Sequence, residues 1–262
     1  MKLGIVAEST GLPLRAAITE AAKLGVAGIE VAAAGELAPG RLGESGRREF
    51  RNLLRSFNQE LAALQLPLRH GLDAAENQQE RIDHIRAAMQ LAYDLGARKL
   101  VVPCPKLPGD AEARGTVLRE TLTALGAFGD RTGAVLALEI GFDPAETVKS
   151  YLGRFDSGSL KVTFDPASLL MHGHDPLASL APLQGLLAHV HARDARSAGL
   201  SRGLQEVPLG AGDVDWLVLT ATLQVLEYDG FLCVEREQGE NRLADIAAGV
   251  KFLRRFVRIT PA

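Results

Sequence analysis

The chain has 262 residues, a length that suits one large α/β domain or two small ones. Hydrophobic residues make up 47% of it and charged residues 23%, so it has enough apolar material for a globular core. The formal net charge of −3 argues against a protein that holds nucleic acid mainly through its phosphates.

The sequence carries no signal of a secreted or membrane-bound protein. Cys104 and Cys233 are far apart and form no CxxC motif, so they predict neither a disulfide framework nor a cysteine metal site. The first apolar run stops at Glu8, which is too early for a signal peptide, and no run approaches the roughly 18 residues of a membrane helix. We therefore expect a cytoplasmic protein with neither a membrane nor a nucleic-acid partner.

Short strand-like runs alternate with longer helical stretches along the whole chain. Gly25 and Gly96 close two of the helical stretches, and Pro103 and Pro105 mark the end of the fourth strand. In chain order, strands are predicted at 2–9, 27–33, 66–71, 99–105, 134–141, 160–166, 186–194 and 231–237. Helices are predicted between and after them at 14–25, 46–65, 79–97, 113–133, 144–155, 176–183, 215–230 and 242–257.

Repeated strand–helix units force the strands to be parallel and the crossovers to be right-handed. Eight such units in about 250 residues have the size of a closed (β/α)8 barrel. An open doubly wound sheet is the alternative, but the first strand–helix turn lacks the GxGxxG that commonly marks it. Since no break in composition divides the chain, we predict a single TIM-barrel domain over residues 1–262.

Functional residues of such a barrel lie at the carboxyl ends of its strands. The last four predicted strands end in LALEIG, VTFDP, HVHARD and CVERE, and each offers a side chain suited to binding a metal ion. These side chains are Glu139, Asp165, His191 and Glu235. Alternation along a strand places a small or modestly polar residue below each of them, as a barrel interior requires. These lower residues are Ala137, Thr163, His189 and Cys233.

Three carboxylates and one imidazole at one rim repel each other unless a cation lies between them. A divalent ion removes the repulsion, and this donor set suits Mn²⁺, Mg²⁺, Co²⁺ or Zn²⁺ with positions left for substrate oxygens. A single acidic residue at a strand end is more often a loop cap or an ion-pair partner. Four in succession favour one divalent metal ion.

The motifs LALEIG, TFDPASLL, HVHARDA, PLGAGDVDW and FLCVERE together resemble those of the xylose-isomerase-like sugar phosphate isomerase/epimerase family. The resemblance covers nearly the whole chain and is strongest from 134 to 240. It implies that Glu139, Asp165, His191 and Glu235 hold one metal ion. It also implies that Glu139 and Glu235 are the catalytic acid and base, which move a proton through an enediolate.

The resemblance extends to substrate and assembly. It implies a small carbohydrate substrate, a homodimer, and a basic substrate-binding residue after His191, which is Arg193 or Arg196. Epimerases of the family carry a histidine three residues after the strand-six aspartate. Here that residue is Ser168, which weakens the transfer of a specific ketohexose epimerase activity.

Further residues have two interpretations. His70 ends the third predicted strand and either binds a substrate hydroxyl or caps a loop, and Glu237 shares the face of Glu235 and is a further substrate-binding candidate. The GxG of PLGAGDVDW is a weak phosphate signal. We interpret it as a turn whose Asp213 or Asp215 caps the next helix. His189 is expected inside the barrel, supporting the ligands.

These observations favour a metal-dependent isomerase or epimerase of a sugar or sugar phosphate. A dehydratase or lyase is the first alternative, because an enediolate can expel a hydroxyl from the neighbouring carbon. A barrel that binds carbohydrate without catalysis is the second. An endonuclease of the type that cuts at abasic sites is disfavoured, because the fourth strand ends in PCP without further ligands and the net charge is negative.

Overall fold

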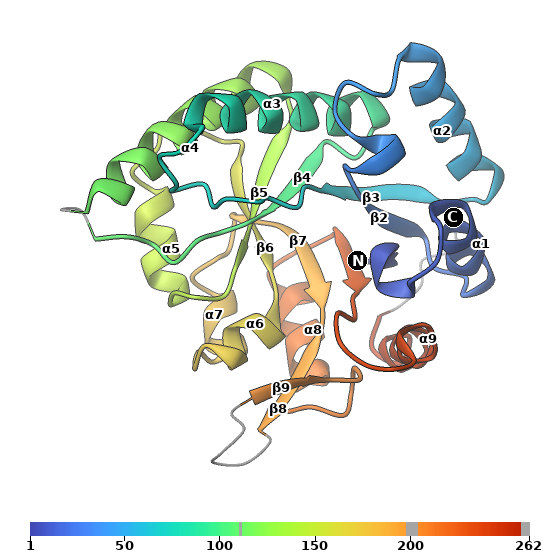
Figure 1. Cartoon of the computed structure of the whole chain (residues 1–262). Coiled ribbons are helices and arrows are strands. Elements are labelled where there is room, and N and C mark those ends of the chain that lie inside the picture. Colours follow the sequence, from blue (N-terminus) through green and yellow to red (C-terminus); the bar gives the residue numbers. More distant parts are fainter. Residues whose placement is uncertain (110–111, 198–203, 258–262) are drawn as a thin grey trace.

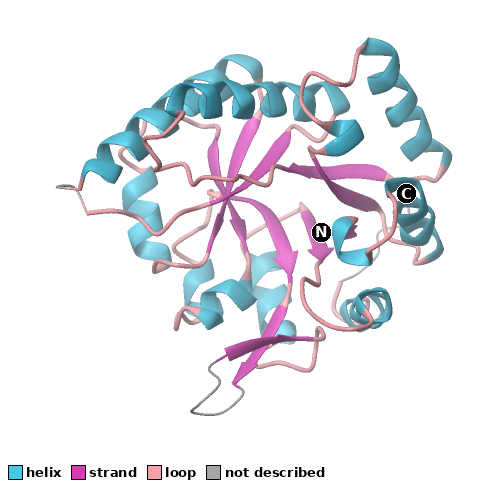
Figure 2. Cartoon of the chain, in the orientation of Figure 1, coloured by secondary structure: helices cyan, strands magenta, loops and turns pink. Residues whose placement is uncertain are grey.

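In the computed structural model, which describes residues 1–109, 112–197 and 204–257, eight parallel strands close into a barrel. The strand order is β1-β10-β7-β6-β5-β4-β3-β2. Figures 1 and 2 show the helices packed around the outside of the strands. Pairing of the first strand with the last closes the barrel, with Gly4 opposite Cys233. The predicted (β/α)8 architecture is confirmed and the open sheet is excluded.

The strands are short, as expected for a barrel wall. They are β1 (Lys2–Val6), β2 (Gly28–Ala32), β3 (Glu60–Gln65), β4 (Lys99–Pro103), β5 (Val135–Ile140), β6 (Leu160–Phe164), β7 (Leu187–Ala192) and β10 (Phe231–Val234). The helices are η1 (Glu8–Thr10), α1 (Leu14–Lys23), η2 (Gly35–Leu37), α2 (Glu44–Ser56), α3 (Gln78–Leu95), α4 (Ala113–Thr132), α5 (Ala145–Leu152), α6 (Pro166–Met171), α7 (Pro176–Leu180), α8 (Trp216–Val225) and α9 (Arg242–Leu253). Within the described ranges, none of these helices combines the length and the apolar character that crossing a bilayer requires.

The third strand–helix unit differs from the prediction. The predicted helix over 46–65 is wrong in its second half, because α2 ends at Ser56 and Asn58 takes a left-handed conformation with φ 53°. The chain then forms β3, and the predicted strand at 66–71 is a loop. Residues 61–64 are all buried, since a barrel strand is covered on both faces. Such an apolar run fits a helix as well as a strand.

Two insertions beside the predicted ligands were not foreseen from the sequence. The short helix α6 begins directly after β6, and an antiparallel hairpin of β8 (Asp194–Ser197) and β9 (Leu204–Val207) follows β7. The predicted strand over 186–194 therefore contains the whole of β7 and the first residue of β8. Both insertions lie at the carboxyl end of the barrel strands, beside the predicted ligands.

The barrel interior is narrow and filled by small side chains. Ala63, Val101 and Ala137 pack together from three neighbouring strands. A Cβ atom added to Gly28 would lie 2.6 Å from the ring of Phe231, so this strand must carry glycine there. Thr163, His189 and Cys233 are also fully buried, as their position below the predicted ligands requires.

The carboxylate of Asp194 organises the loop PLGAGDVDW. It accepts hydrogen bonds from the backbone N–H groups of Ala195, Gly210, Gly212 and Val214 and from the indole N–H of Trp216, at 2.9 to 3.2 Å. A Cβ on Gly212 would lie 2.0 Å from its Oδ1 atom. The glycines of this loop therefore leave room for the Asp194 carboxylate, which belongs to the protein itself. Asp215 caps α8 by accepting from the backbone N–H of Val218, as predicted for one of two aspartates.

Replacing Asp194 should destabilise the fold more than replacing Asp215. Asp194→Ala leaves several buried N–H donors without an acceptor, and we expect the free energy of unfolding to fall by about 3 kcal/mol. Asp215→Ala removes one helix cap and should cost about 1 kcal/mol. Urea denaturation followed by circular dichroism measures both values. Equal losses would contradict the organising role of Asp194.

Candidate metal centre

The ends of four neighbouring strands bring Glu139, Asp165, His191 and Glu235 together. One ligand atom from each side chain lies within 4.8 Å of those of the other three. Asp165, His191 and Glu235 are buried, whereas the side chain of Glu139 keeps 16% of its surface exposed. Glu139 therefore lies where the cluster meets solvent.

Strand register and one helix terminus place these side chains. Glu139 pairs with Thr163 across β5 and β6, and His191 pairs with Cys233 across β7 and β10. Asp165 is the N-cap of α6, and its Oδ1 atom accepts from the backbone N–H of Ser168 at 3.0 Å. This contact holds the carboxylate at the rim, where its Oδ2 atom accepts from Arg193.

The imidazole of His191 lies among the carboxylates. Its Nδ1 atom is 3.1 Å from Glu235 Oε2 and 3.3 Å from Glu139 Oε1. Burial by itself lowers the pKa of His191, but the charges of Glu235 and Glu30 outweigh burial and raise that pKa well above its usual value. The ring is therefore protonated on both nitrogens, and this imidazolium is the cation of the cluster.

The two glutamates of the cluster have different proton affinities. Burial raises the pKa of Glu235 to about 7, in spite of the opposing charge of His191. Burial also raises the pKa of Glu139, but the hydrogen bond and the charge of His191 outweigh burial and lower it overall. Two carboxylates on either side of one ring thus differ in the pH at which each gives up its proton.

Arg193 lies next to the cluster with 5% of its side chain exposed. Its Nη1 donates to Asp165 Oδ2 and its Nη2 to Glu237 Oε2, both at 2.7 Å. Its Nε lies 3.5 Å from Glu206 Oε1 on β9. Two of the predicted substrate-binding residues, Arg193 and Glu237, are therefore brought to the cluster.

The other two predicted substrate-binding residues lie elsewhere. His70 is exposed on the loop after β3, because that strand ends at Gln65, six residues earlier than predicted. Arg196 is exposed on β8, where it pairs with Gln205 of the hairpin. Neither side chain belongs to the cluster, and a role for either in substrate binding stays a prediction.

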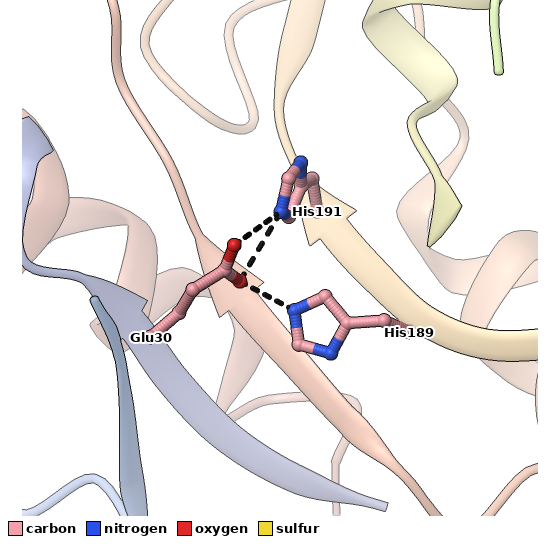
Figure 3. Close-up of side chains that lie close together, drawn as sticks. All are labelled: Glu30, His189 and His191. Atoms are coloured by element: carbon pink, nitrogen blue, oxygen red, sulfur yellow. Dashed lines mark hydrogen bonds and ion pairs between the residues drawn. The ribbon is translucent and has the colours of Figure 1, made fainter. Parts of the chain in front are cut away.

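Sequence reasoning missed Glu30 on β2. This carboxylate is fully buried, and Figure 3 shows it facing His189 and His191. The distance from Glu30 Oε2 to His189 Nε2 is 2.6 Å, and that from Glu30 Oε1 to His191 Nε2 is 3.1 Å. Its signal in the sequence was a lone charge inside the apolar strand AGIEVAA. His189 lies inside the barrel as expected.

The cluster has the chemistry of a site for one divalent cation. It gathers three carboxylates and one ring nitrogen, and the nearest cationic group to the buried Glu235 Oε2 atom is the ring of His191, whose Nδ1 atom lies 3.1 Å away. Oxygen ligands with one imidazole suit Mn²⁺, Mg²⁺, Co²⁺ or Zn²⁺. An ion among these atoms would take the place of the proton on His191 Nδ1 and offset the charges of the carboxylates. The residues present therefore fit the ion.

A family model described as xylose isomerase-like TIM barrel matches residues 18–256. The chain belongs to this family. The inosose dehydratase of Lacticaseibacillus casei is 30% identical to it over 97 residues, an alignment that covers 32% of each protein. The alignment with an inosose dehydratase of Clostridium perfringens, 27% identical over 145 residues, covers 48% of each. These matches thus span less than half the length of either curated relative.

Solved structures of xylose isomerase-like and epimerase proteins superpose over nearly the whole barrel. The xylose isomerase domain protein of Planctomyces limnophilus has a TM-score of 0.85 at 20% identity, covering 97% of this chain and 98% of that one. D-psicose 3-epimerase of Clostridium cellulolyticum H10 has 0.78 at 15%, covering 98% and 99%. The IOLI protein, solved with a bound zinc atom, has 0.79 at 16%, covering 99% and 100%. At these identities the likeness shows the shared fold.

Metal binding should weaken as the pH falls. An ion must displace the proton of His191 at any pH near neutrality, and below about pH 7 it must also displace that of Glu235. We expect the Kd for Mn²⁺ or Zn²⁺ to rise about tenfold for each unit by which the pH falls above pH 7, and to rise more steeply as the pH falls below 7. Titration calorimetry between about pH 8 and pH 6 measures this slope. The control Glu237→Gln, which changes a residue outside the cluster, should show the same dependence of the Kd on pH. A Kd that does not change with pH would contradict the ligand set.

Proposed function

We propose that this xylose isomerase-like barrel is a divalent-metal-dependent isomerase or epimerase of a sugar or polyol-type keto compound. The observation that carries the proposal is the meeting of Glu139, Asp165, His191 and Glu235 at the mouth of the barrel. The zinc atom in the structurally similar IOLI protein and the epimerase among the similar structures support it. The ion would polarise a substrate carbonyl and stabilise the charge of an enediolate.

Glu139 and Glu235 divide the proton transfer in this proposal. Glu139 is the more exposed carboxylate, with a lowered pKa, and it takes the proton from the carbon next to the carbonyl. Glu235 is buried with a raised pKa, and it returns a proton, to the neighbouring carbon in an isomerase or to the opposite face of the same carbon in an epimerase. Arg193 and Glu237 are the proposed substrate-binding residues beside them, since both lie at the same rim.

A dehydratase is the second candidate. The enediolate formed by the same proton abstraction can lose a hydroxyl from the next carbon, and Glu235 would then protonate the leaving oxygen. Two observations favour it: the curated relatives are inosose dehydratases, and Ser168 replaces the histidine of the family's epimerases. Ser168 packs so closely against Gly141 that a Cβ there would lie 1.9 Å from its Oγ atom.

Replacing either proposed acid–base residue should stop proton exchange at carbon. Glu139→Gln and Glu235→Gln each remove a titratable oxygen, and we expect kcat to fall by about 10² to 10⁴-fold. Proton NMR in D₂O measures the exchange of a carbon-bound proton in ketoses and inososes. Glu146→Gln, an exposed glutamate of α5, is the control and should retain the wild-type rate. Retained exchange in Glu139→Gln would refute its role as the base.

The products separate the two candidate reactions. An isomerase or epimerase should yield an isomer of the substrate in which a deuterium from the solvent replaces one hydrogen. A dehydratase should yield a product that has lost one water relative to the substrate. Mass spectrometry of a panel of ketohexoses and inososes, incubated with the Mn²⁺-loaded protein in D₂O, distinguishes these outcomes. If the panel shows no exchange and no elimination, the alternative of a barrel that binds carbohydrate without catalysis is favoured.

A further inference from the structure

The carboxylate of Glu30 reaches across the barrel interior to two histidines of β7. The strand order places β1 and β10 between β2 and β7. The register partner of Glu30 on β1 is Val6, and the register partner of His191 on β10 is Cys233. All three interacting side chains are fully buried, so this contact is shielded from solvent (Figure 3).

The contact determines which ring nitrogen of His191 keeps its proton when a metal ion displaces the other proton. A carboxylate only accepts hydrogen bonds, so Nε2 of His191, 3.1 and 3.2 Å from the two Glu30 oxygens, must donate. A neutral imidazole with its proton on Nε2 has a lone pair on Nδ1. That Nδ1 atom faces Glu139 and Glu235 in the cluster. Glu30 thus selects the tautomer that a metal ligand requires.

His189 holds Glu30 in this position. Its Nε2 atom lies 2.6 Å from Glu30 Oε2, while its Nδ1 atom is buried without a hydrogen-bond partner. The ring therefore has one polar contact among the described residues, and that contact is with Glu30. With two imidazoles donating to it, the carboxylate cannot rotate without breaking a buried hydrogen bond.

Glu30, His189 and His191 also have the composition of a second metal site. The distances argue against this alternative. A Zn²⁺ ion holds nitrogen and oxygen ligands at about 2.0–2.2 Å, which keeps the ligand atoms about 3 Å or more apart. The 2.6 Å between Glu30 and His189 is the length of a strong hydrogen bond.

We propose that Glu30 is a positioning residue that orients His191 for metal binding through its Nδ1 atom, and that His189 holds Glu30 in place. This inference rests on the proposed metal centre. Glu30 is buried behind His191 and acts through that ring without touching the substrate. Metal-bound histidines commonly donate their second N–H to a carboxylate, which fixes the ring and strengthens it as a ligand.

The variant Glu30→Gln tests this role through metal affinity. The amide keeps the shape and removes the charge, and we expect the Kd for Zn²⁺ to rise 10- to 100-fold with one ion still bound per chain. Competition with a chromophoric chelator at constant pH gives both numbers. Cys233→Ala, in the same interior and opposite His191 in register, is the matched control and should stay within about twofold of the wild type.

The histidine tautomer is a second readout that needs no variant. In the wild-type protein loaded with Zn²⁺, ¹H–¹⁵N spectra of the side chains should show His191 protonated at Nε2 with metal at Nδ1. Protonation at Nδ1, or an unchanged Kd in folded Glu30→Gln, overturns the proposal. Two ions in the wild type and one in Glu30→Gln would make Glu30 a metal ligand instead. A wild type that binds no ion overturns the metal centre itself, and with it this role.

Discussion

Electrostatic repulsion at the mouth of the barrel is the constraint on which the rest of this site depends. Three carboxylates meet there, and burial disfavours the charge of each. The protonated ring of His191 and the guanidinium of Arg193 supply the positive charge that keeps them together. A metal ion would supply more charge from a smaller volume. The same carboxylates that need a cation are the groups that can move a proton.

The hairpin after β7 supports this arrangement from outside the barrel wall. Glu206 on β9 accepts hydrogen bonds from the backbone N–H groups of Glu237 and Gln238, at 3.0 and 2.8 Å. The same carboxylate lies 3.5 Å from Arg193 and 3.5 Å from Arg236. One buried side chain thus ties the end of β7 to the end of β10. The hairpin and the organised loop behind Asp194 together hold the rim on which two of the four candidate ligands lie.

The predicted positions of the candidate residues agree with the structure where each was tied to a correctly placed strand end, and they differ where the strand was misplaced. Glu139 and His191 lie in the last two residues of their strands, Asp165 and Glu235 directly follow theirs, and the structure brings all four together. His70 was expected at a strand end, but β3 lies earlier in the chain and His70 is exposed on a loop. The error arose because ELAALQ is buried on both faces, so its pattern lacks the alternation that separates a strand from a helix.

By itself the sequence determined the number and order of strand–helix units, because the alternation of apolar runs with amphipathic stretches is local. It also determined which polar side chain ends each of the last four strands, because period-two alternation assigns each residue to a face. Only the tertiary structure decided what those side chains meet. Glu30 contacts His189 and His191 from 159 and 161 residues away, across two intervening strands. No local pattern carries such a contact, because barrel closure and register bring those atoms together.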